Sequence, residues 1–528
     1  MATITIEDLT FSYDTNGEEI FSHLSLSLDT RWRLGLIGRN GRGKTTLLRL
    51  LMGEYAYRGR ISSAVPFDYF PFPTAGADRP ALEVVREAVA PFSEWEAEMG
   101  RLTEDGSPAA LNRYGELLEQ YQSCDGYCID ERIKREANLL QVPDGALARP
   151  FGALSGGEQT KLLLAALFLR KNRFLLIDEP TNHLDAQGRR AVAEYLRRKA
   201  GFLLVSHDRA VLNEAVDHIL SINRSTVTLQ KGNYDVWKEN QDRREQFEAA
   251  EKERLQRDIR RLSSAAARSA DWSDRVEREK NGTRLSGLRP DRGYLGHQAA
   301  KLMKRAKAAE QRRTRAVEEA KSLLLDTETQ EPLKIHTQTP LRSRLLEVRD
   351  LTLRFEGGPA LIGASFTVEA GDRVALTGPN GCGKTSLLKL VLGEPIPHEG
   401  VCRPASGLTL SYLPQDASFL RGELRDFLQA RALDEPLFKA ILRKLGFSRN
   451  QFEKRLEELS AGQKKKVLLA ASLAKPAHLY LWDEPLNYLD IPSRIQLEEL
   501  LPACKPTLLF VEHDAVFAER VATKRVSL

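Results

Sequence analysis

Two segments of the sequence carry residues whose types and spacing suit them to holding phosphate groups. Each reads Gly-x-Asn-Gly-x-Gly-Lys-Thr, over residues 38–45 and again over residues 378–385. Glycines let backbone N–H groups close around phosphate oxygens, the following helix adds partial positive charge, and the lysine reaches the terminal phosphates. The last threonine of each segment is placed to ligate Mg²⁺. The predicted phosphate-binding residues are Gly38, Asn40, Gly41, Gly43, Lys44, Thr45, Thr46, Gly378, Asn380, Gly381, Gly383, Lys384, Thr385 and Ser386.

Further along each copy, an apolar run ends in an Asp-Glu pair, and a second apolar run is followed by a histidine. The aspartate can hold Mg²⁺ directly or through water. The glutamate would then face the attacking water as general base or orienting group, and the histidine could contact the terminal phosphate. An acidic pair that caps a helix and a structural histidine are the alternatives, and the recurrence of all three residues at matching positions weighs against them. The predicted metal ligands are Asp178 and Asp483, and the predicted catalytic residues are Glu179, Glu484, His207 and His513.

These motifs must be positioned by two copies of one domain. The phosphate-binding segments are 340 residues apart, whereas the Asp-Glu pairs are 305 apart, so the first copy is 35 residues longer between its motifs. In each copy an apolar strand-like segment precedes the glycine loop and a helix-like segment follows it, which is the context that this loop requires. Fully apolar strands interleaved with helices predict a parallel or mixed α/β core. The two domains are expected over residues 1–235 and 343–528.

Composition limits the remaining possibilities. The chain has 528 residues, 42% of them hydrophobic, and a formal net charge of +5, which is too small for a surface that binds nucleic acid everywhere. Five scattered cysteines without a CxxC pair argue against a disulfide framework or a zinc module. The N-terminus lacks a signal-peptide pattern, and no apolar run approaches the roughly 18 residues needed to cross a bilayer. We therefore expect a cytoplasmic protein without a membrane-spanning segment.

Positive charge gathers between the two domains. Residues 241–320 hold 21 Lys and Arg against 14 Asp and Glu, a net charge of +7. Two helix-like stretches flank a turn-rich segment over residues 281–297, which predicts a long helical hairpin over residues 236–342. Near the tip, basic residues meet almost no acidic ones, a pattern suited to phosphate backbones, and an aromatic ring there could stack on bases. A solvated charged hairpin is the alternative. The predicted RNA-binding residues are Arg284, Leu285, Leu288, Arg289, Arg292, Tyr294, Lys301, Lys304, Arg305 and Lys307.

Together with Leu-Ser-Gly-Gly-Glu at 154–158, Leu-Ser-Ala-Gly-Gln at 459–463, and Asn-x-Leu-Asp at 182–185 and 487–490, these motifs resemble tandem ATP-binding cassettes. The resemblance implies an ATP hydrolase that uses ATP and Mg²⁺, with two α/β P-loop cassettes that close head to tail around two nucleotides within one monomer. The first composite site would pair the first P-loop with the second signature segment, and the second site would pair the second P-loop with the first signature. It also implies these ATP-binding residues: Tyr13 and Phe355 for adenine, and Ser155, Gly156, Gly157, Glu158, Ser460, Ala461, Gly462 and Gln463 in the signatures.

Two departures from the family pattern fall on the first composite site. Gln415 corresponds to the glutamine that contacts Mg²⁺ in this family, but the matching position in the first copy is Phe72. Ala461 replaces a signature glycine. We therefore expect unequal sites, with faster hydrolysis at the second, although both glutamates remain.

A basic hairpin between tandem cassettes is similar to the ABC-F group of translation factors. The extra residues of the first cassette lie within about 82–147, where that group carries its arm insertion, and residues 291–307 resemble the hairpin of the branch that confers resistance to lincosamides, pleuromutilins and streptogramin A. The resemblance implies binding at the 50S exit site of the 70S ribosome, with the hairpin near 23S rRNA, the P-site tRNA and the peptidyl transferase centre. It implies antibiotic displacement, direct or through rRNA and tRNA.

Two other readings share the nucleotide motifs. A housekeeping ABC-F translation factor would have the same architecture without conferring resistance. A tandem ATPase subunit of a membrane transporter has no evident use for a long basic projection. Zinc modules or very long coiled coils, which mark DNA-repair cassettes, are not found in the sequence.

Overall fold

The computed structural model describes residues 2–13, 19–105, 107–182, 184–223, 226–247, 333–335, 337–338, 342–355 and 358–528. It also describes residues 250–251, 253–254, 257, 260–261, 264, 301, 304, 307–308, 311–312 and 314. Contacts divide the chain into two compact units. One comprises Met1–Ile222, Val227–Tyr234 and Gln330–Leu528, and the other comprises Asn223–Thr226 and Asp235–Thr329. The first unit holds both cassettes, and the predicted hairpin belongs to the second.

The first cassette is built on a six-stranded sheet, in which five parallel strands are followed by one antiparallel edge strand. The inner strands are largely apolar and buried, as expected of a parallel sheet that is covered on its faces, whereas the antiparallel edge strand is half-buried and more polar. In spatial order they are β5 (Phe67–Phe70), β6 (Phe174–Asp178), β7 (Phe202–Val205), β3 (Arg33–Gly38), β8 (His218–Ile222) and β9 (Val227–Lys231). A smaller antiparallel sheet contains β2 (Glu19–Asp29), β1 (Thr3–Ser12) and β4 (Arg58–Ser63).

The second cassette repeats this design, with five parallel strands in its main sheet and three antiparallel strands in its smaller one. The main sheet runs β14 (Leu410–Leu413), β15 (Leu479–Asp483), β16 (Leu508–Val511), β12 (Arg373–Thr377) and β17 (Lys524–Ser527). The smaller sheet runs β11 (Gly358–Glu369), β10 (Arg344–Phe355) and β13 (His398–Pro404). The predicted α/β class with two P-loop cassettes is confirmed, because both sheets place a glycine loop and a helix directly after a central parallel strand.

Helices cover the main sheets. In the first cassette they are α1 (Lys44–Leu51), α6 (Gly156–Leu169), α7 (Ala186–Arg197) and α8 (Arg209–Ala215). In the second they are α11 (Lys384–Val391), α12 (Leu424–Ala430), α13 (Glu435–Lys444), α14 (Ala461–Ala474), α15 (Ile491–Cys504) and α16 (Ala515–Val521).

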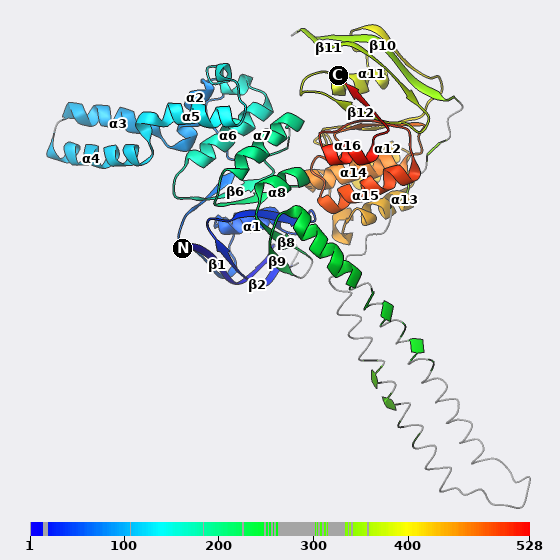
Figure 1. Ribbon diagram of the computed structural model, residues 1–528, viewed down its shortest axis with the longest axis horizontal. Helices are drawn as coiled ribbons and strands as arrows, with labels where there is room; N and C mark the ends of the chain where they lie inside the picture. Colours follow the sequence, from blue (N-terminus) through cyan, green and yellow to red (C-terminus); the bar gives the residue numbers. More distant parts are fainter. Residues whose placement is uncertain are drawn as a thin grey trace, which may run out of the picture. The chain divides into compact units, whose positions relative to one another are not determined.

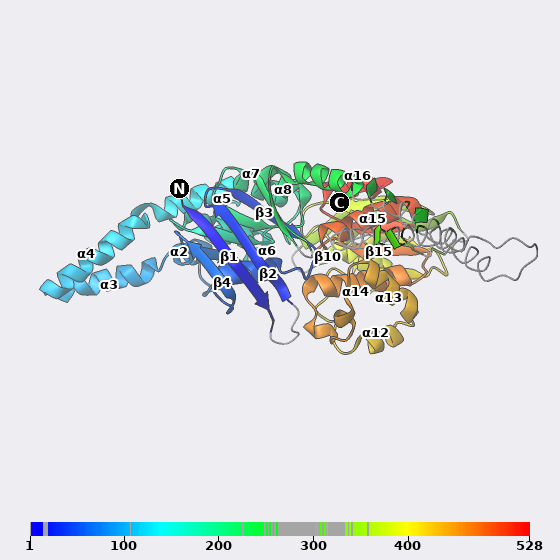
Figure 2. The ribbon, with the colours of Figure 1, turned by 90° about the horizontal axis from the view of Figure 1, so that it is seen from below.

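The extra residues of the first cassette form helices. The segment contains α2 (Ala81–Val89), α3 (Phe92–Asp105), α4 (Pro108–Ser123) and α5 (Ile129–Leu139). Figures 1 and 2 show α3 and α4 running side by side, and Arg113 Nε on α4 donates to Glu98 Oε1 on α3 at 3.0 Å. Ser107 caps α4 by accepting a hydrogen bond from Ala110 N, and Pro108 fits the first helical position.

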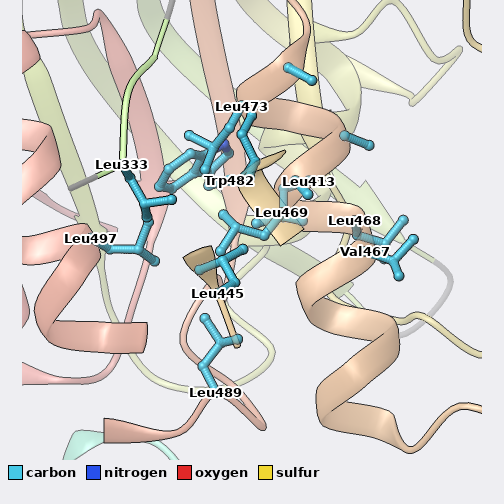
Figure 3. Close-up of a cluster of buried hydrophobic side chains, with 14 of the residues drawn as sticks. Leu333, Leu413, Leu445, Val467, Leu468, Leu469, Leu473, Trp482, Leu489 and Leu497 are labelled. Atoms are coloured by element: carbon cyan, nitrogen blue, oxygen red, sulfur yellow. The ribbon is translucent and has the colours of Figure 1, made fainter. Parts of the chain in front are cut away.

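The core of the second cassette surrounds Trp482, which lies on β15 and is fully buried (Figure 3). Leucines from α14, β14 and α15 pack around its ring, and Leu333, which precedes β10, lies in the same cluster. The indole Nε1 donates to Ser472 Oγ at 2.9 Å, so the one polar atom of this large side chain is satisfied inside the core. The packing fixes β15 and therefore the position of Asp483 at its end.

Of the second unit, the structure describes Asn223 and Thr226, helical residues 235–247, and further helical residues between 250 and 264 and between 301 and 314. Lys301, Lys304 and Lys307 are among them and are exposed. The remaining predicted tip residues, Arg284, Leu285, Leu288, Arg289, Arg292, Tyr294 and Arg305, lie outside the described residues. No described helix is long and apolar enough to cross a membrane.

Candidate active sites

The carboxyl ends of neighbouring parallel strands bring the predicted residues of each cassette together. The first P-loop follows β3, Asp178 ends β6, and His207 follows β7, which lies between them in the sheet. The second cassette arranges its P-loop, Asp483 and His513 in the same way around β12, β15 and β16. An open parallel sheet binds ligands at this edge, so the topology creates one candidate site on each sheet.

Glycine is required in the P-loop for physical reasons. Gly43 has φ 90°, and a Cβ there would lie 2.5 Å from Ile20 Cγ2. Gly43 also precedes α1, whose first turn has no side-chain cap, so backbone N–H groups at the helix start remain available to an anion. Gly383 before α11 has the same left-handed conformation, with φ 91°.

Both P-loop lysines are buried and donate to acceptors of their own loops. Lys44 Nζ donates to Gly38 O at 2.8 Å and Arg39 O at 3.2 Å, and Lys384 Nζ donates to Gly378 O at 2.9 Å and Pro379 O at 2.8 Å. Burial lowers the pKa of Lys44. An ammonium group held away from water in this way favours a bound anion nearby.

The residues predicted to hold Mg²⁺ face each other. Thr45 Oγ1 donates to Asp178 Oδ2 at 2.9 Å, and Tyr69 OH donates to the same oxygen at 3.2 Å. Asp483 is fully buried, and neither of its carboxylate oxygens has a hydrogen-bond partner among the described residues. Burial raises the pKa of Asp483 to about 6. An unpartnered buried carboxylate beside a threonine and a phosphate-binding loop fits a hard cation such as Mg²⁺.

Both predicted catalytic glutamates adopt a left-handed backbone conformation, with φ 49° at Glu179 and φ 45° at Glu484. A residue with a side chain rarely adopts this conformation, and such strain is typical of functional sites. Sheet hydrogen bonds stabilise it, because Glu179 N donates to Val205 O at 2.9 Å and Glu484 N donates to Val511 O at 3.0 Å.

The surroundings of the two glutamates differ. Gln415 Nε2 donates to Glu484 Oε2 at 2.9 Å, and Asn487 Nδ2 donates to the same oxygen. Glu179 Oε1, in contrast, is buried without a hydrogen-bond partner among the described residues, and His207 Nε2 lies 3.5 Å from it. Burial, with a further contribution from Asp178, raises the pKa of Glu179 to about 7.

Phe72, which replaces the glutamine in the first copy, stacks against the guanidinium group of Arg170. The Arg170 guanidinium lies 4.5 Å from the centroid of the Phe72 ring, and Arg170 Nε also donates to Ala88 O at 2.9 Å. In the first copy this position therefore packs next to α2, whereas in the second it holds the carboxylate of Glu484, the predicted catalytic residue.

The two histidines are neutral. Burial is the largest cause that lowers the pKa of each: the value for His207 falls well below the usual range, and that for His513 falls to about 4. His207 Nε2 lies 3.1 Å from Asn40 Oδ1, and His513 Nε2 lies 3.7 Å from Glu484 Oε1.

Residues of the second cassette complete the first composite site. Asn40 N donates to Asp490 Oδ2 at 2.9 Å, and Asn40 Nδ2 donates to Tyr488 O at 2.8 Å. Lys466 Nζ donates to the same Asp490 oxygen at 2.7 Å and, although burial opposes it, holds the pKa of that carboxyl well below its usual range. A Cβ at Gly41 would lie 4.0 Å from Gln463 Nε2, so the first P-loop directly adjoins the second signature segment.

The second and fifth residues of each signature segment together cap the helix that follows, with the serine as the N-cap. Ser155 N donates to Glu158 Oε2 at 2.9 Å and Glu158 N donates to Ser155 Oγ at 3.2 Å, which forms a capping box at the start of α6. Ser460 and Gln463 form the same box on α14. Gly156 and Ala461 occupy the first helical positions, where a Cβ at Gly156 would meet no described atom within 4 Å. Ala461 therefore fits a position that tolerates a methyl group.

The predicted adenine contacts differ in how far the structure describes them. Tyr13 OH and Thr46 Oγ1 lie 2.8 Å apart, which places the Tyr13 ring beside the start of α1. Phe355 is the last residue of β10, and its side chain is not described. Asn380, Gly381 and Ser386 lie in the second loop and the start of α11, as Gly378 and Thr385 do.

Sequence reasoning missed several charged residues at these sites. Asp490 ends the repeated Asn-x-Leu-Asp motif, but its contacts with Asn40 of the opposite P-loop and with Lys466 depend on long-range folding. Lys465 is fully buried, its Nζ donates to Pro414 O at 2.9 Å and Asp483 O at 3.1 Å, and burial lowers its pKa to about 8. The matching residue in the first copy is Thr160, and no sequence signal marks the difference.

Two phosphate loops with acidic strand ends and histidines, each on a parallel sheet edge, define a tandem P-loop ATPase. The profile of the ABC transporter family matches residues 21–182 and 361–487. The chain therefore belongs to the ABC transporter family, within its ABC-F group, and is an ATP hydrolase that binds nucleotide.

Individual relatives match nearly the whole chain. The ribosome protection protein VmlR of Bacillus subtilis strain 168 is 28% identical over 98% of this chain and 85% of its own length. The energy-dependent translational throttle protein EttA of Haemophilus influenzae is 28% identical over 96% of this chain and 88% of its own. A crystal structure of archaeal ribosome recycling factor aABCE1 with stalk protein aP1 is similar in fold, with a TM-score of 0.58 and 19% identity. The match covers 98% of this chain and 87% of the other.

The contact at Gly462 generates a prediction about the first site. A Cβ at residue 462 would lie 2.4 Å from Asn40 Nδ2 and 2.6 Å from Tyr488 O, and a backbone carbonyl cannot move aside cheaply. In a Glu484→Gln background, which leaves the first site to be measured, Gly462→Ala should lower ATP hydrolysis by about tenfold or more, because small misplacements of reacting groups are costly. Ala461→Gly is the matched control and should hydrolyse ATP normally. Equal rates for both variants would show that the working enzyme does not form this contact.

The pKa of Glu179 generates a second prediction. A carboxyl group with a raised pKa loses its ability to accept a proton as the pH falls through that value, so kcat/KM of the Glu484→Gln variant should decline below a midpoint at about pH 7. Neutral His207 should not contribute in this range. Adding Phe72→Gln should move the midpoint to lower pH, because an amide that donates to the carboxylate favours its charged form. A flat profile between about pH 6 and pH 8 would contradict the assignment of Glu179 as the base.

Proposed function

We propose that the chain is a ribosome-binding ABC-F ATPase that protects the ribosome from antibiotics. It binds the 50S exit-site region of the 70S ribosome, and its interdomain hairpin reaches 23S rRNA and the P-site tRNA near the peptidyl transferase centre, where it displaces drugs. The observation that carries this proposal is the match to a ribosome protection protein over 98% of the chain, since that match includes the segment between the cassettes.

The described part of that segment supports a contact with phosphate. Lys301, Lys304 and Lys307 are helical and exposed, and their spacing of three residues places them on one side of a helix. Exposed lysines along one helix face suit an RNA backbone, which attracts cations regardless of base sequence. We assign RNA contacts to these lysines and to Arg284, Leu285, Leu288, Arg289, Arg292, Tyr294 and Arg305.

In the ATP cycle that we propose, each composite site holds one nucleotide between a P-loop and the opposite signature segment. Thr45 with Asp178, and Thr385 with Gln415 and Asp483, would hold Mg²⁺, which neutralises phosphate charge during hydrolysis. Glu179 and Glu484 accept a proton from the attacking water, and the neutral imidazoles of His207 and His513 can donate a hydrogen bond toward the phosphate. ATP binding closes the cassettes on the ribosome, and hydrolysis releases the protein into the cytoplasm.

The second site is proposed to hydrolyse ATP faster. Gln415 and Asn487 orient Glu484 by direct hydrogen bonds, whereas Glu179 has its pKa raised to about 7 and lacks the glutamine. The raised pKa of Glu179 favours its protonated form, which cannot act as a base, and its orientation would depend on fewer contacts.

The release step has a direct test. Glu179→Gln together with Glu484→Gln removes both proposed bases and should trap the protein on 70S ribosomes when ATP is present, because the closed state can no longer decay. Cosedimentation with purified ribosomes measures this trapping, and the double variant with ADP is the control. If the double variant left ribosomes in ATP as fast as wild type, hydrolysis would not drive release.

The resistance role has a separate test. EttA is a translational throttle protein and matches this chain at the same 28% identity as VmlR, so a housekeeping translation factor is the second candidate. Expression in a susceptible bacterium should raise the inhibitory concentrations of lincosamides, pleuromutilins and streptogramin A, but not that of an aminoglycoside. The Lys44→Ala/Lys384→Ala variant should abolish the effect. Ribosome binding without any such increase would favour the housekeeping role.

A further inference from the structure

Arg209, at the start of α8, forms buried ion pairs with the second cassette: it is hydrogen-bonded to Glu498, and its NH2 lies 4.0 Å from Asp514 Oδ2. Arg209 NH1 donates to Glu498 Oε2 at 3.1 Å, and Arg209 NH2 donates to Glu498 Oε1. The guanidinium thus grips the carboxylate with two parallel hydrogen bonds, the strongest geometry for this pair. The side chains are 9% and 1% exposed. Arg520 of the second cassette also donates to Glu498 Oε2, at 2.9 Å, so the carboxylate is fully satisfied.

This ion pair exists on one side of the repeat only. The position that matches Arg209 in the second cassette is Ala515, and the position that matches Glu498 in the first is Ala193. Ion pairs within each cassette, in contrast, occur in both copies. Arg189 NH1 lies 3.2 Å from Asp208 Oδ2 in the first cassette, and Arg494 NH1 lies 3.4 Å from Asp514 Oδ2 in the second. The ion pair between the cassettes is therefore present on one side of the repeat, and the matching positions on the other side hold two alanines.

Both partners belong to elements that build the first composite site. Arg209 follows His207 by two residues, and His207 Nε2 lies 3.1 Å from Asn40 Oδ1. Glu498 lies on α15, whose N-cap is Asp490, the carboxylate that accepts from Asn40 N. A helix is stiff over two turns, so an ion pair at Glu498 limits the movement of Asp490 relative to the first P-loop.

We propose that the Arg209–Glu498 ion pair is a positioning element that keeps the first composite site assembled through the ATP cycle, so that the cassettes open mainly at the second site. The first site then releases nucleotide slowly, and the second exchanges it at each turnover. Separating the cassettes at the first site would expose or strand these two buried charges, whereas Ala193 and Ala515, at the matching positions of the second site, carry no charge. The inference rests on the proposed pairing of each P-loop with the opposite signature segment.

The test measures nucleotide release from each site of the full-length protein. The Arg209→Ala/Glu498→Ala variant gives the first side the two alanines that this protein already has on the other side, and Arg520 remains exposed enough to be solvated. Wild type should retain about one ADP per chain after free nucleotide is removed, and Lys44→Ala but not Lys384→Ala should abolish that retention. The double alanine variant should release this ADP about tenfold faster or more, as expected when a buried pair across an interface is lost.

A matched control removes an ion pair that lies far from the interface. Arg113→Ala/Glu98→Ala deletes the contact between α4 and α3 and should leave ADP release unchanged. Thermal unfolding of each variant verifies that it is folded, and Glu498→Gln, which keeps the side-chain volume, provides a second measurement with faster release expected. Release at the wild-type rate from both interface variants overturns the inference.

The outcome is separable from the proposed function. Ribosome cosedimentation with ATP reports the partner, whereas ADP retention off the ribosome reports the ion pair. If the first site released ADP slowly but the protein did not bind ribosomes, the proposed function would be wrong and the inference about the ion pair would stand. If the protein bound ribosomes but both sites released ADP equally fast, the inference about the Arg209–Glu498 ion pair would be wrong and the proposed function would stand.

Discussion

The first site depends on the hydrogen bonds that satisfy the buried ammonium group of Lys44. Its solvation is replaced by Gly38 O, Arg39 O and Asn40 Oδ1, at 2.8, 3.2 and 3.4 Å. Asn40 in turn bonds the second cassette through Tyr488 O and Asp490. The requirement to satisfy one buried cation thus couples the loop conformation, the residue His207 that follows β7 and the opposite cassette.

The two copies share this frame and differ in how they satisfy buried carboxylates. Glu484 accepts hydrogen bonds from two amides, whereas Glu179 has a buried oxygen without a described partner and a raised pKa. Both pay the same conformational cost, because both adopt positive φ. Glu179 and Glu484 therefore have the same strained backbone conformation but different hydrogen-bond partners. The position of the glutamate is kept in both sites, whereas its affinity for a proton differs between them.

Much of this arrangement could be predicted from the sequence because the motifs are local. A glycine loop between an apolar strand and a helix admits one conformation around phosphate, and two copies of the motif with matching acidic pairs establish the repeat. The left-handed glutamates could not be predicted, since φ at Glu179 is set by the hydrogen bond to Val205 on a neighbouring strand. The contact between Asn40 and Asp490 joins residues 450 positions apart, and no spacing rule reaches that distance.

In the signature segments, the motif predicts a defect at Ala461, whereas the geometry of the structure shows a different position to be crowded. Reading Ala461 as a defect assumes that the substituted glycine touches nucleotide or the opposite cassette. Its matching residue, Gly156, has room for a Cβ, whereas the next residue along, Gly462, has none, because Asn40 and Tyr488 occupy that space. Glu158 and Gln463 are already committed to capping their helices. The difference between the two sites therefore stems less from the signature than from Phe72 and from the ion pair between Arg209 and Glu498. One alters the support of a catalytic base, and the other alters how freely the cassettes can part.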